Sequence, residues 1–227
     1  MQLFELCGKD EDVRFSPYVW RVRMSLMHKG LPFDVVPVRF LDKKPLENAQ
    51  SKTVPVLNDE GTWVKDSFDI ALYLEHTYPD RPLFGGELAE GQARLLNEWA
   101  TQTMVRSIFP MIVADIHSRL DDKNGAYFRE TREKFLGCTL EEAQADRDAK
   151  VVPFRQSMAP VRNTLQAQEF LCGSSPAWAD YCVFGTLMWA RIASEFALFE
   201  VDDPIMAWTD KMLDMFDGYA RKAKLGY

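Results

Sequence analysis

The sequence predicts a chain of two unlike halves, an α/β domain with a mixed four-stranded sheet followed by a bundle made only of helices. Short β-prone segments alternate with helical ones up to Tyr78, which is typical of α/β domains. A segment rich in proline and glycine follows over 79–86, and no convincing strand comes after it. We therefore expect an α/β domain over 1–80, a linker over 81–88 and a helical domain over 89–227.

Local patterns define the elements of the first half. A helix over Pro17–Lys29 has apolar residues near helical spacing, and Gly30 stands where a C-terminal cap belongs. The turn Asp59–Gly61 joins two short strands into a hairpin, which makes the sheet mixed. The expected elements in chain order are a strand over 2–7, a helix over 17–29, a strand over 33–38, an uncertain polar segment over 43–51, a hairpin over 55–65 and a helix over 68–76.

The second half is helical in period throughout. Its first segment is interrupted by Pro110, where we expect a kink or break because proline has no N–H to donate within a helix. The expected helical segments are 87–120, 130–150, 154–170, 178–196 and 204–219.

Composition and charge exclude several classes of function. The 227 residues include 27 basic and 34 acidic ones, a net charge of −7, which disfavours nucleic acid or an anionic membrane as partner. Apolar runs fall far short of the ~20 residues that a membrane span needs, and the first residues lack the features of a signal peptide. The four cysteines form no CxxC pair and no finger-like spacing with the three histidines. We expect a reduced, cytoplasmic protein without a metal.

The first junction between strand and helix contains Ser16 followed by Pro17. Serine is a preferred N-cap and proline a preferred first helical residue, so capping accounts for this pair on its own. A helix N-terminus also offers unpaired N–H groups and a partial positive charge. The hydroxyl of Ser16 is therefore a candidate to face an anion of a ligand, and the two roles are compatible.

Two later junctions carry similar signals. Val54–Pro55 fits a plain strand start, or a cis bond that turns the backbone of Val54 toward an extended peptide. Asp66 and Ser67 open the helix over 68–76, and Asp66 with Asp69 fits a capping box. Alternatively, Asp66 pairs with an ammonium group and Ser67 holds a carboxylate, the two charged groups at the α-carbon of an amino acid.

With these junctions in this order, the sequence resembles the glutathione transferase superfamily over nearly its whole length. The segment Ser16–Arg21, reading SPYVWR, is similar to the serine-type bacterial β-etherases and their fungal transferase relatives. The chain departs from the superfamily at Ala177, where a hydroxyl or amide side chain usually forms a capping box with Asp180. It also departs at Thr53, where many relatives carry a basic residue and Lys52 stands next door.

The resemblance implies a thioredoxin-like first domain and a helical second domain. It implies that Ser16 stabilises the thiolate of glutathione, the co-substrate, and that Lys52, Val54, Pro55, Asp66 and Ser67 bind the tripeptide. It also implies a homodimer and a small hydrophobic or aromatic electrophile, for which Trp99, Arg106 and Phe109 on the first long helix are candidate contacts.

Three other functions remain open from the sequence. The SPYVWR segment also fits a glutathione-dependent β-aryl etherase, in which the thiolate displaces a phenolate. A non-catalytic glutathione-binding or scaffold protein is possible on the same fold, although the intact set of Ser16, Val54, Asp66 and Ser67 argues against it. A glutaredoxin-like oxidoreductase is the weakest reading, because Cys7 lies in a predicted strand and not at a helix start that activates thiols.

Overall fold

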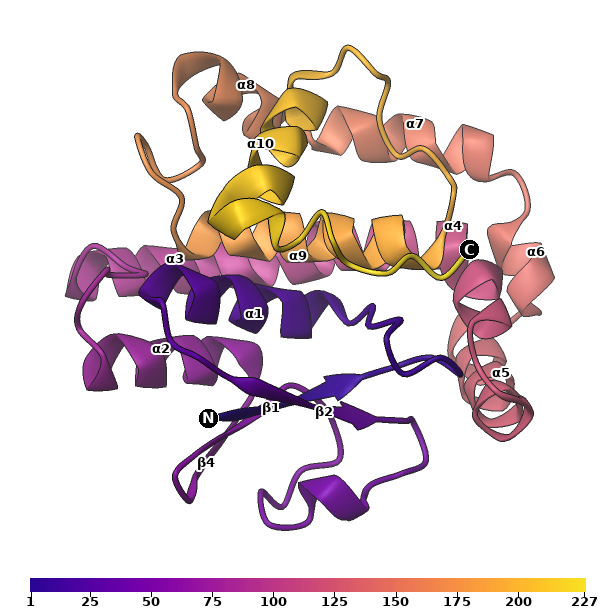
Figure 1. Ribbon diagram of the computed structural model, residues 1–227. Helices are drawn as coiled ribbons and strands as arrows, with labels where there is room; N and C mark the ends of the chain where they lie inside the picture. Colours follow the sequence, from indigo (N-terminus) through magenta and orange to yellow (C-terminus); the bar gives the residue numbers. More distant parts are fainter.

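A computed structural model of residues 1–227 confirms the two halves, a four-stranded mixed sheet with helices and a helical domain stacked on it (Figure 1). The strands are β1 (Gln2–Leu6), β2 (Asp34–Val38), β3 (Val56–Asp59) and β4 (Thr62–Lys65), in the order β2-β1-β3-β4. β1 pairs parallel with β2 and antiparallel with β3, and β3 pairs antiparallel with β4. The expected hairpin is therefore present, and the arrangement is that of a thioredoxin-like domain.

The two faces of the sheet pack against different partners. Leu3 pairs with Leu57 in register and both join the main core, whereas the next pair, Phe4 and Val56, belongs to a small cluster on the opposite face. This alternation follows from the two-residue period of a strand. The short 3-10 helix η1 (Lys44–Leu46) contributes Leu46 to the small cluster, so the polar segment over 43–51 serves as a cover for the sheet.

Helices α1 (Pro17–Lys29) and α2 (Ser67–Thr77) lie on the main-core face of the sheet, between it and the second domain (Figure 1). No regular element is present between the end of α2 and Glu87. None of the helices combines the length and apolar character that crossing a membrane requires. The helices of the second domain are α3 (Glu87–Trp99), α4 (Arg106–Ser118), α5 (Asp122–Leu136), α6 (Leu140–Gln144), α7 (Arg147–Ser157), α8 (Ala159–Ala167), α9 (Trp178–Ala193) and α10 (Pro204–Gly218).

Helix α9 is the centre of the second domain and packs directly on α1. Gly185 makes this possible, because a Cβ atom there would lie 2.7 Å from the carbonyl oxygen of Pro17 and 3.0 Å from the backbone nitrogen of Arg21. The guanidinium of Arg21 is fully buried and its Nη1 donates to Asn97 Oδ1 at 2.8 Å. The first turn of α1 is thus fixed against the helical domain.

The predicted break at Pro110 is misplaced. Pro110 lies inside α4, and the irregular turn is the π-helical segment η2 (Ala100–Val105), which precedes α4. Pro110 cannot donate to the carbonyl of Arg106 and its ring crowds that carbonyl, so the helix adjusts one turn earlier. A widened π turn accommodates such a mismatch without ending the helix.

The segment over 130–150, expected to be helical, is divided among the three helices α5, α6 and α7. Gly137 ends α5 in the left-handed conformation, with φ of 75°, and its N–H donates to Glu133. Thr139 then begins α6 with a capping box, in which its hydroxyl accepts from the N–H of Glu142 and its own N–H donates to the Glu142 carboxylate. The Thr-Leu-Glu-Glu sequence is a recognisable start signal.

The close contact at Gly185 leads to a stability prediction. We expect Gly185→Ala to lower the free energy of unfolding by about 1–3 kcal/mol, because the new methyl group meets backbone atoms of α1 that cannot move independently. Urea denaturation followed by circular dichroism measures the change.

Gly85→Ala, in the segment before α3, is the matched control. A Cβ at Gly85 meets only the Cβ of Ala89, at the ordinary contact distance of 3.5 Å, and the φ of Gly85 is not positive, so this substitution should leave stability unchanged or raise it by up to about 1 kcal/mol. Equal effects of the two substitutions would contradict the role assigned to the α1–α9 contact.

Candidate functional site

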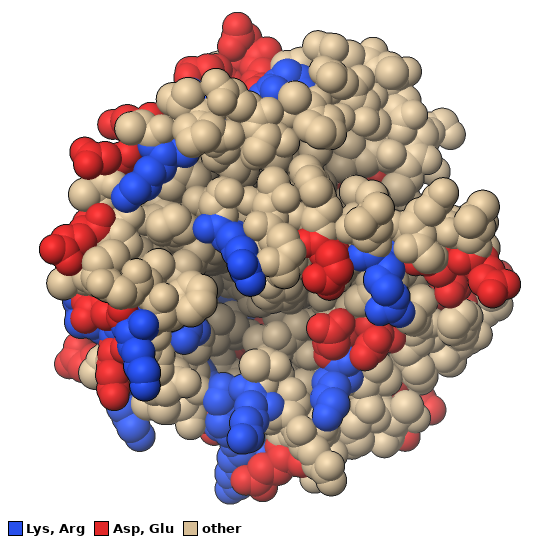
Figure 2. All heavy atoms as spheres, turned by 180° about the vertical axis from the view of Figure 1, so that it is seen from behind, with Lys and Arg blue, Asp and Glu red and all other residues tan.

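A cavity of about 740 Å³ lies between the two domains, at the N-terminal end of α1. Its walls come from both domains: the start of α1, the loop after β2, the loop before β3, the start of α2, and helices α4, α5 and α9. The face of the molecule seen in Figure 2 is hollowed, and basic and acidic side chains gather around the hollow. A volume of this size is in the range of small-molecule sites.

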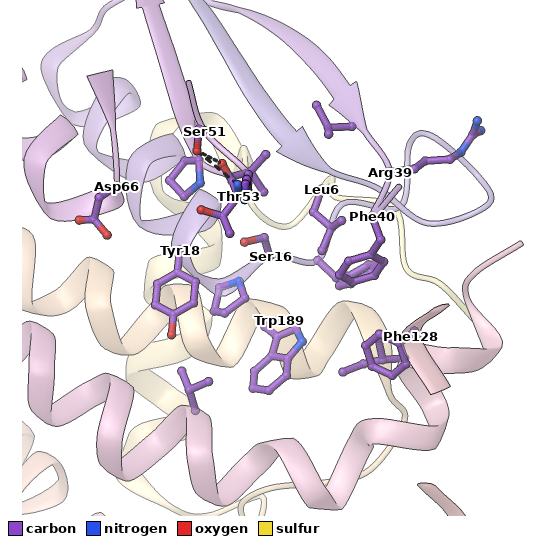
Figure 3. Close-up of a pocket in the computed structure, with 18 of the residues that line it drawn as sticks. Leu6, Ser16, Tyr18, Arg39, Phe40, Ser51, Thr53, Asp66, Phe128 and Trp189 are labelled. Carbon is purple, nitrogen blue, oxygen red and sulfur yellow. Dashed lines mark hydrogen bonds between the residues drawn. The ribbon is translucent and has the colours of Figure 1, made fainter. Parts of the chain in front are cut away.

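Ser16 occupies the centre of the cavity wall (Figure 3). It is 5% exposed, and its hydroxyl oxygen accepts a hydrogen bond of 3.4 Å from the N–H of Val19, so it is the N-cap of α1. Pro17 follows as the first helical residue. The expected capping role is confirmed, and the same hydroxyl faces the cavity with the positive end of a helix behind it.

The loop before β3 supplies an unused pair of backbone groups. The Val54–Pro55 peptide bond is cis, and both residues line the cavity beside Lys52 and Thr53. The N–H and C=O of Val54 make no hydrogen bond within the chain, whereas the neighbouring Thr53 exchanges two with the hydroxyl of Ser51. These two groups are available to an extended ligand, as a strand edge would be.

The start of α2 places carboxylates at one end of the cavity. Asp66 is the N-cap, with Oδ1 accepting from the N–H of Phe68 at 2.8 Å and φ at 72°. Asp69 lines the cavity too, but no reciprocal bond to it completes the expected capping box. Ser67, the next residue, is 2% exposed and does not line the cavity. The backbone N–H groups in the first turn of α2 have no partner within the helix, so they are the hydrogen-bond donors that α2 can offer to a ligand at this end of the cavity.

The other end of the cavity is aromatic. Phe40, from the loop after β2, packs against Phe128 of α5 with ring centroids 5.5 Å apart. Phe109 of α4 stacks on Trp189 of α9 at 6.3 Å with an interplanar angle of 17°. Figure 3 shows Asp66 and Thr53 on one side of Ser16 and the rings of Phe40 and Phe128 on the other. The cavity therefore has a polar end and an apolar end that meet at the Ser16 hydroxyl.

Of the three expected contacts on the first long helix, only Phe109 lines the cavity. Arg106 is exposed and follows the cavity residue Val105 by one position, which turns its side chain about 100° away. Trp99 precedes Val105 by six residues, across the π turn, and lies outside the cavity. The structure corrects these two predictions of location.

Several cavity residues were missed by sequence reasoning. Tyr18 belongs to the SPYVWR segment and had a local signal, two residues after Ser16. The others come from segments far apart in the chain that no local pattern connects, namely Arg39, Phe40, Lys43, Tyr127, Phe128, Arg132 and Trp189.

Two basic residues shape the electrostatics of the apolar end. Burial lowers the pKa of the Lys43 ammonium, and the neighbouring Arg132 lowers it further, while Asp42 acts in the opposite direction. Burial also lowers the pKa of the Arg132 guanidinium. Neither side chain forms an ion pair.

The cysteine side chains lie outside the cavity wall. Cys7, the candidate for a redox role, is buried, which raises the pKa of its thiol and disfavours the reactive thiolate. The structure contains no group of three or more His, Cys, Asp or Glu side chains that could hold a metal ion.

Comparisons with known proteins agree with this geometry. Two family models match, described as "Glutathione S-transferase, N-terminal domain" over residues 15–77 and "Glutathione S-transferase, C-terminal domain" over residues 92–216. The glutathione S-transferase-like protein ustS of Aspergillus flavus is 25% identical over 78% of this chain and 74% of its own length. Glutathione S-transferase Z1 of Arabidopsis thaliana is 34% identical over 40% of this chain and 42% of its own length.

Solved structures share the fold across nearly the whole chain. A glutathione S-transferase of Ceriporiopsis subvermispora, solved in complex with glutathione, superposes with a TM-score of 0.81 at 24% identity and covers 96% of both chains. Glutathione transferase GSTFuA3 of Phanerochaete chrysosporium gives a TM-score of 0.83 at 23% identity, again over 96% of both chains. Since the family models together match more than half of the sequence, the chain belongs to the glutathione S-transferase family.

Proposed function

We propose that this protein is a glutathione transferase in which Ser16 stabilises the thiolate of glutathione for attack on a hydrophobic electrophile. The observation that carries the proposal is the position of the Ser16 hydroxyl, at the N-terminus of a helix and at the meeting point of a polar and an aromatic end of one cavity. A nucleophile held there has the tripeptide's polar groups on one side and an apolar acceptor on the other.

The polar end fits an extended tripeptide. The unpaired N–H and C=O of Val54, next to the Pro55 ring, suit the backbone of the central cysteine of glutathione. The carboxylate of Asp66 suits the ammonium group of its γ-glutamyl end, and the N-terminal turn of α2, which begins at Ser67, suits the carboxylate of the same end. Lys52 borders the cavity and suits the carboxylate of the glycine end.

One hydrogen bond from Ser16, together with the helix N-terminus, is strong enough to lower the thiol pKa of glutathione as far as the reaction needs. A free thiol has a pKa near ~8.5, so only a few per cent is ionised at pH 7. Lowering that pKa by about two units requires ~2.7 kcal/mol of preference for the thiolate. A hydrogen bond to a charged acceptor supplies ~1.5–3 kcal/mol and the helix terminus ~0.3–1 kcal/mol. The proton then leaves to solvent, and Ser16 acts as a hydrogen-bond donor and not as a nucleophile.

Removing the hydroxyl tests this role. We expect Ser16→Ala to raise the pKa of enzyme-bound glutathione by about 1–2 units and to lower kcat/KM about 10–100-fold near pH 6.5, because the thiolate loses its donor. Ultraviolet absorbance of the bound thiolate against pH gives the pKa, and conjugation of 1-chloro-2,4-dinitrobenzene gives the rate.

Two further variants control for loss of structure. Ser16→Thr keeps a hydroxyl and should retain much of the activity, and Ser25→Ala removes a buried hydroxyl of the same helix that bonds only the carbonyl of Arg21. Full activity of Ser16→Ala would remove the assigned role. Tight binding of glutathione by the wild type without turnover of any electrophile would favour the non-catalytic alternative.

The aromatic end of the cavity also favours a second candidate, β-aryl ether cleavage. The rings of Phe40, Phe128 and Trp189 can pack against an aryl leaving group, which the thiolate displaces as a phenolate. We expect an enzyme of this class to release phenol from a lignin-like β-aryl ether dimer in a glutathione-dependent reaction, measured by liquid chromatography. Release no faster than in the reaction without enzyme would reject this candidate and leave the general transferase.

We further propose that two copies of the chain associate through α3. This helix has no buried residue, and Leu88 and Leu95, which share one face at a spacing of seven residues, are 79% and 70% exposed. Apolar side chains this exposed on one helix face are typical of a surface that a partner covers.

Oligomeric state tests the α3 surface. We expect sedimentation at twice the mass of the chain for the wild type and at the mass of one chain for the double variant Leu88→Glu/Leu95→Glu. Val201→Glu is the control, since Val201 is 95% exposed in the turn before α10. A double variant that remains dimeric would place the interface elsewhere.

A further inference from the structure

The apolar end of the cavity contains two cations without a carboxylate partner. Lys43, from the loop after β2, and Arg132, from α5, both line the cavity, and neither is in an ion pair. The only acidic residues that line the cavity are Asp66 and Asp69, both at the start of α2. Buried charges in proteins are normally paired with a charge of opposite sign. Lys43 and Arg132 therefore form a site that an anionic group of a ligand would complete.

Arg132 is held in a defined position by the aromatic wall. Its guanidinium carbon lies 5.0 Å from the ring centre of Phe128 and 5.6 Å from that of Phe40, and Nη1 donates to the hydroxyl of Thr131 at 3.0 Å. A guanidinium has five N–H donors, so most of them stay free for a ligand. Stacking on the rings orients the planar group without neutralising its charge.

The loop that carries Lys43 is fixed against α5. The side-chain oxygen of Asn124 accepts from the N–H of Leu41 at 3.0 Å, and the amide nitrogen of Asn124 donates to both carboxylate oxygens of Asp121. Lys43 and Arg132 therefore face one region of the cavity although they belong to different domains. Their mutual repulsion, added to burial, lowers the pKa of Lys43, which is consistent with a place prepared for negative charge.

The neighbouring Arg39 provides a contrast. It lines the same rim, but its guanidinium is paired with Glu11 at 3.1 Å and lies 3.8 Å from Asp121, and in Figure 3 it points away from Ser16. Lys52 and Lys65 also line the cavity without an ion pair, but both are exposed. Lys43 and Arg132 are therefore the half-buried cations of the cavity wall that lack a carboxylate partner.

We propose that the electrophile is an aromatic anion, most simply an aryl carboxylate, whose charged group is bound between Lys43 and Arg132 while its ring packs beside Phe40 in the aromatic end of the cavity. This inference rests on the proposed function and narrows its substrate class. The anionic group takes no part in bond making. The glutathione thiolate forms a sulfur–carbon bond at the ring or side chain, and the leaving group departs from that carbon with the bonding electron pair.

A matched pair of acceptors tests the proposal. 4-Chloro-3,5-dinitrobenzoate and 4-chloro-3,5-dinitrobenzamide share the ring and the chloride leaving group and differ in the charge of one substituent. Dividing each kcat/KM by the rate constant of the uncatalysed reaction with glutathione removes their difference in intrinsic reactivity. We expect the wild type to favour the carboxylate over the amide by about tenfold or more, as a charge-assisted hydrogen bond provides.

Variants of Lys43 and Arg132 test whether these two residues cause the preference for the carboxylate over the amide. Lys43→Gln and Arg132→Gln should each reduce the carboxylate-to-amide ratio several-fold, with little change for the amide, and the double variant should bring the ratio close to one. Lys43→Arg should keep the ratio because it keeps the charge. Arg39→Gln, which removes a paired cation from the same rim, is the control and should leave the ratio unchanged.

The outcomes separate this inference from the proposed function. The inference is overturned if the wild type shows a carboxylate-to-amide ratio of one or less. It is also overturned if Lys43→Gln and Arg132→Gln leave the ratio unchanged. In both cases, conjugation of the amide still supports the proposed transferase function. A rise in KM for glutathione with an unchanged ratio also overturns it, because the cations then bind the glycine carboxylate of the tripeptide. If the wild type converts neither acceptor, the proposed transferase function is rejected, and the inference that rests on it fails as well.

Discussion

The contact between α1 and α9 at Gly185 is the constraint on which the site depends. Pro17, whose carbonyl oxygen lies where a Cβ at Gly185 would need space, is the residue directly after Ser16. Any change in the separation of these helices therefore moves the Ser16 hydroxyl. Trp189 lies one turn beyond Gly185 on the same face of α9 and forms part of the cavity wall. One helix thus sets both the position of the proposed thiolate donor and the surface on which an acceptor rests.

The position of α9 is fixed by a buried carboxylate that compensates for an unfavourable cap. Ala177 has no side-chain acceptor, yet Asp180 accepts from the N–H groups of Ala177, Leu171 and Cys172 and from the indole N–H of Trp208. Burial raises the pKa of Asp180, and the backbone N–H donors act in the opposite direction. Asp180 thus bonds the backbone although Ala177 lacks a hydroxyl, and its donors lie well beyond the usual capping box.

Prediction from the sequence succeeded where the signal was local. The Ser16–Pro17 cap, the hairpin around Gly61 and the strand start after Pro55 are each encoded within a few residues whose backbone preferences are strong. It failed for Trp99 and Arg106, because the direction of a side chain on a long helix depends on every preceding turn, and the π turn over 100–105 changes the register in a way that composition does not reveal. For Ser67, a helix start predicts where the backbone N–H groups lie and not how far the first side chain is exposed, and this residue is buried.

The apolar end of the cavity was beyond local reasoning for a further reason. Lys43 and Arg132 are nearly ninety residues apart, and they converge because Asn124 ties the loop after β2 to the start of α5. The polar end is built almost entirely from the first domain, so its recognition of a ligand depends on turns that fold locally. The apolar end takes side chains from both domains and changes with their mutual packing. Selectivity for the acceptor is therefore coupled to the interface between the domains, whereas the chemistry at Ser16 requires only the hydroxyl and the helix behind it.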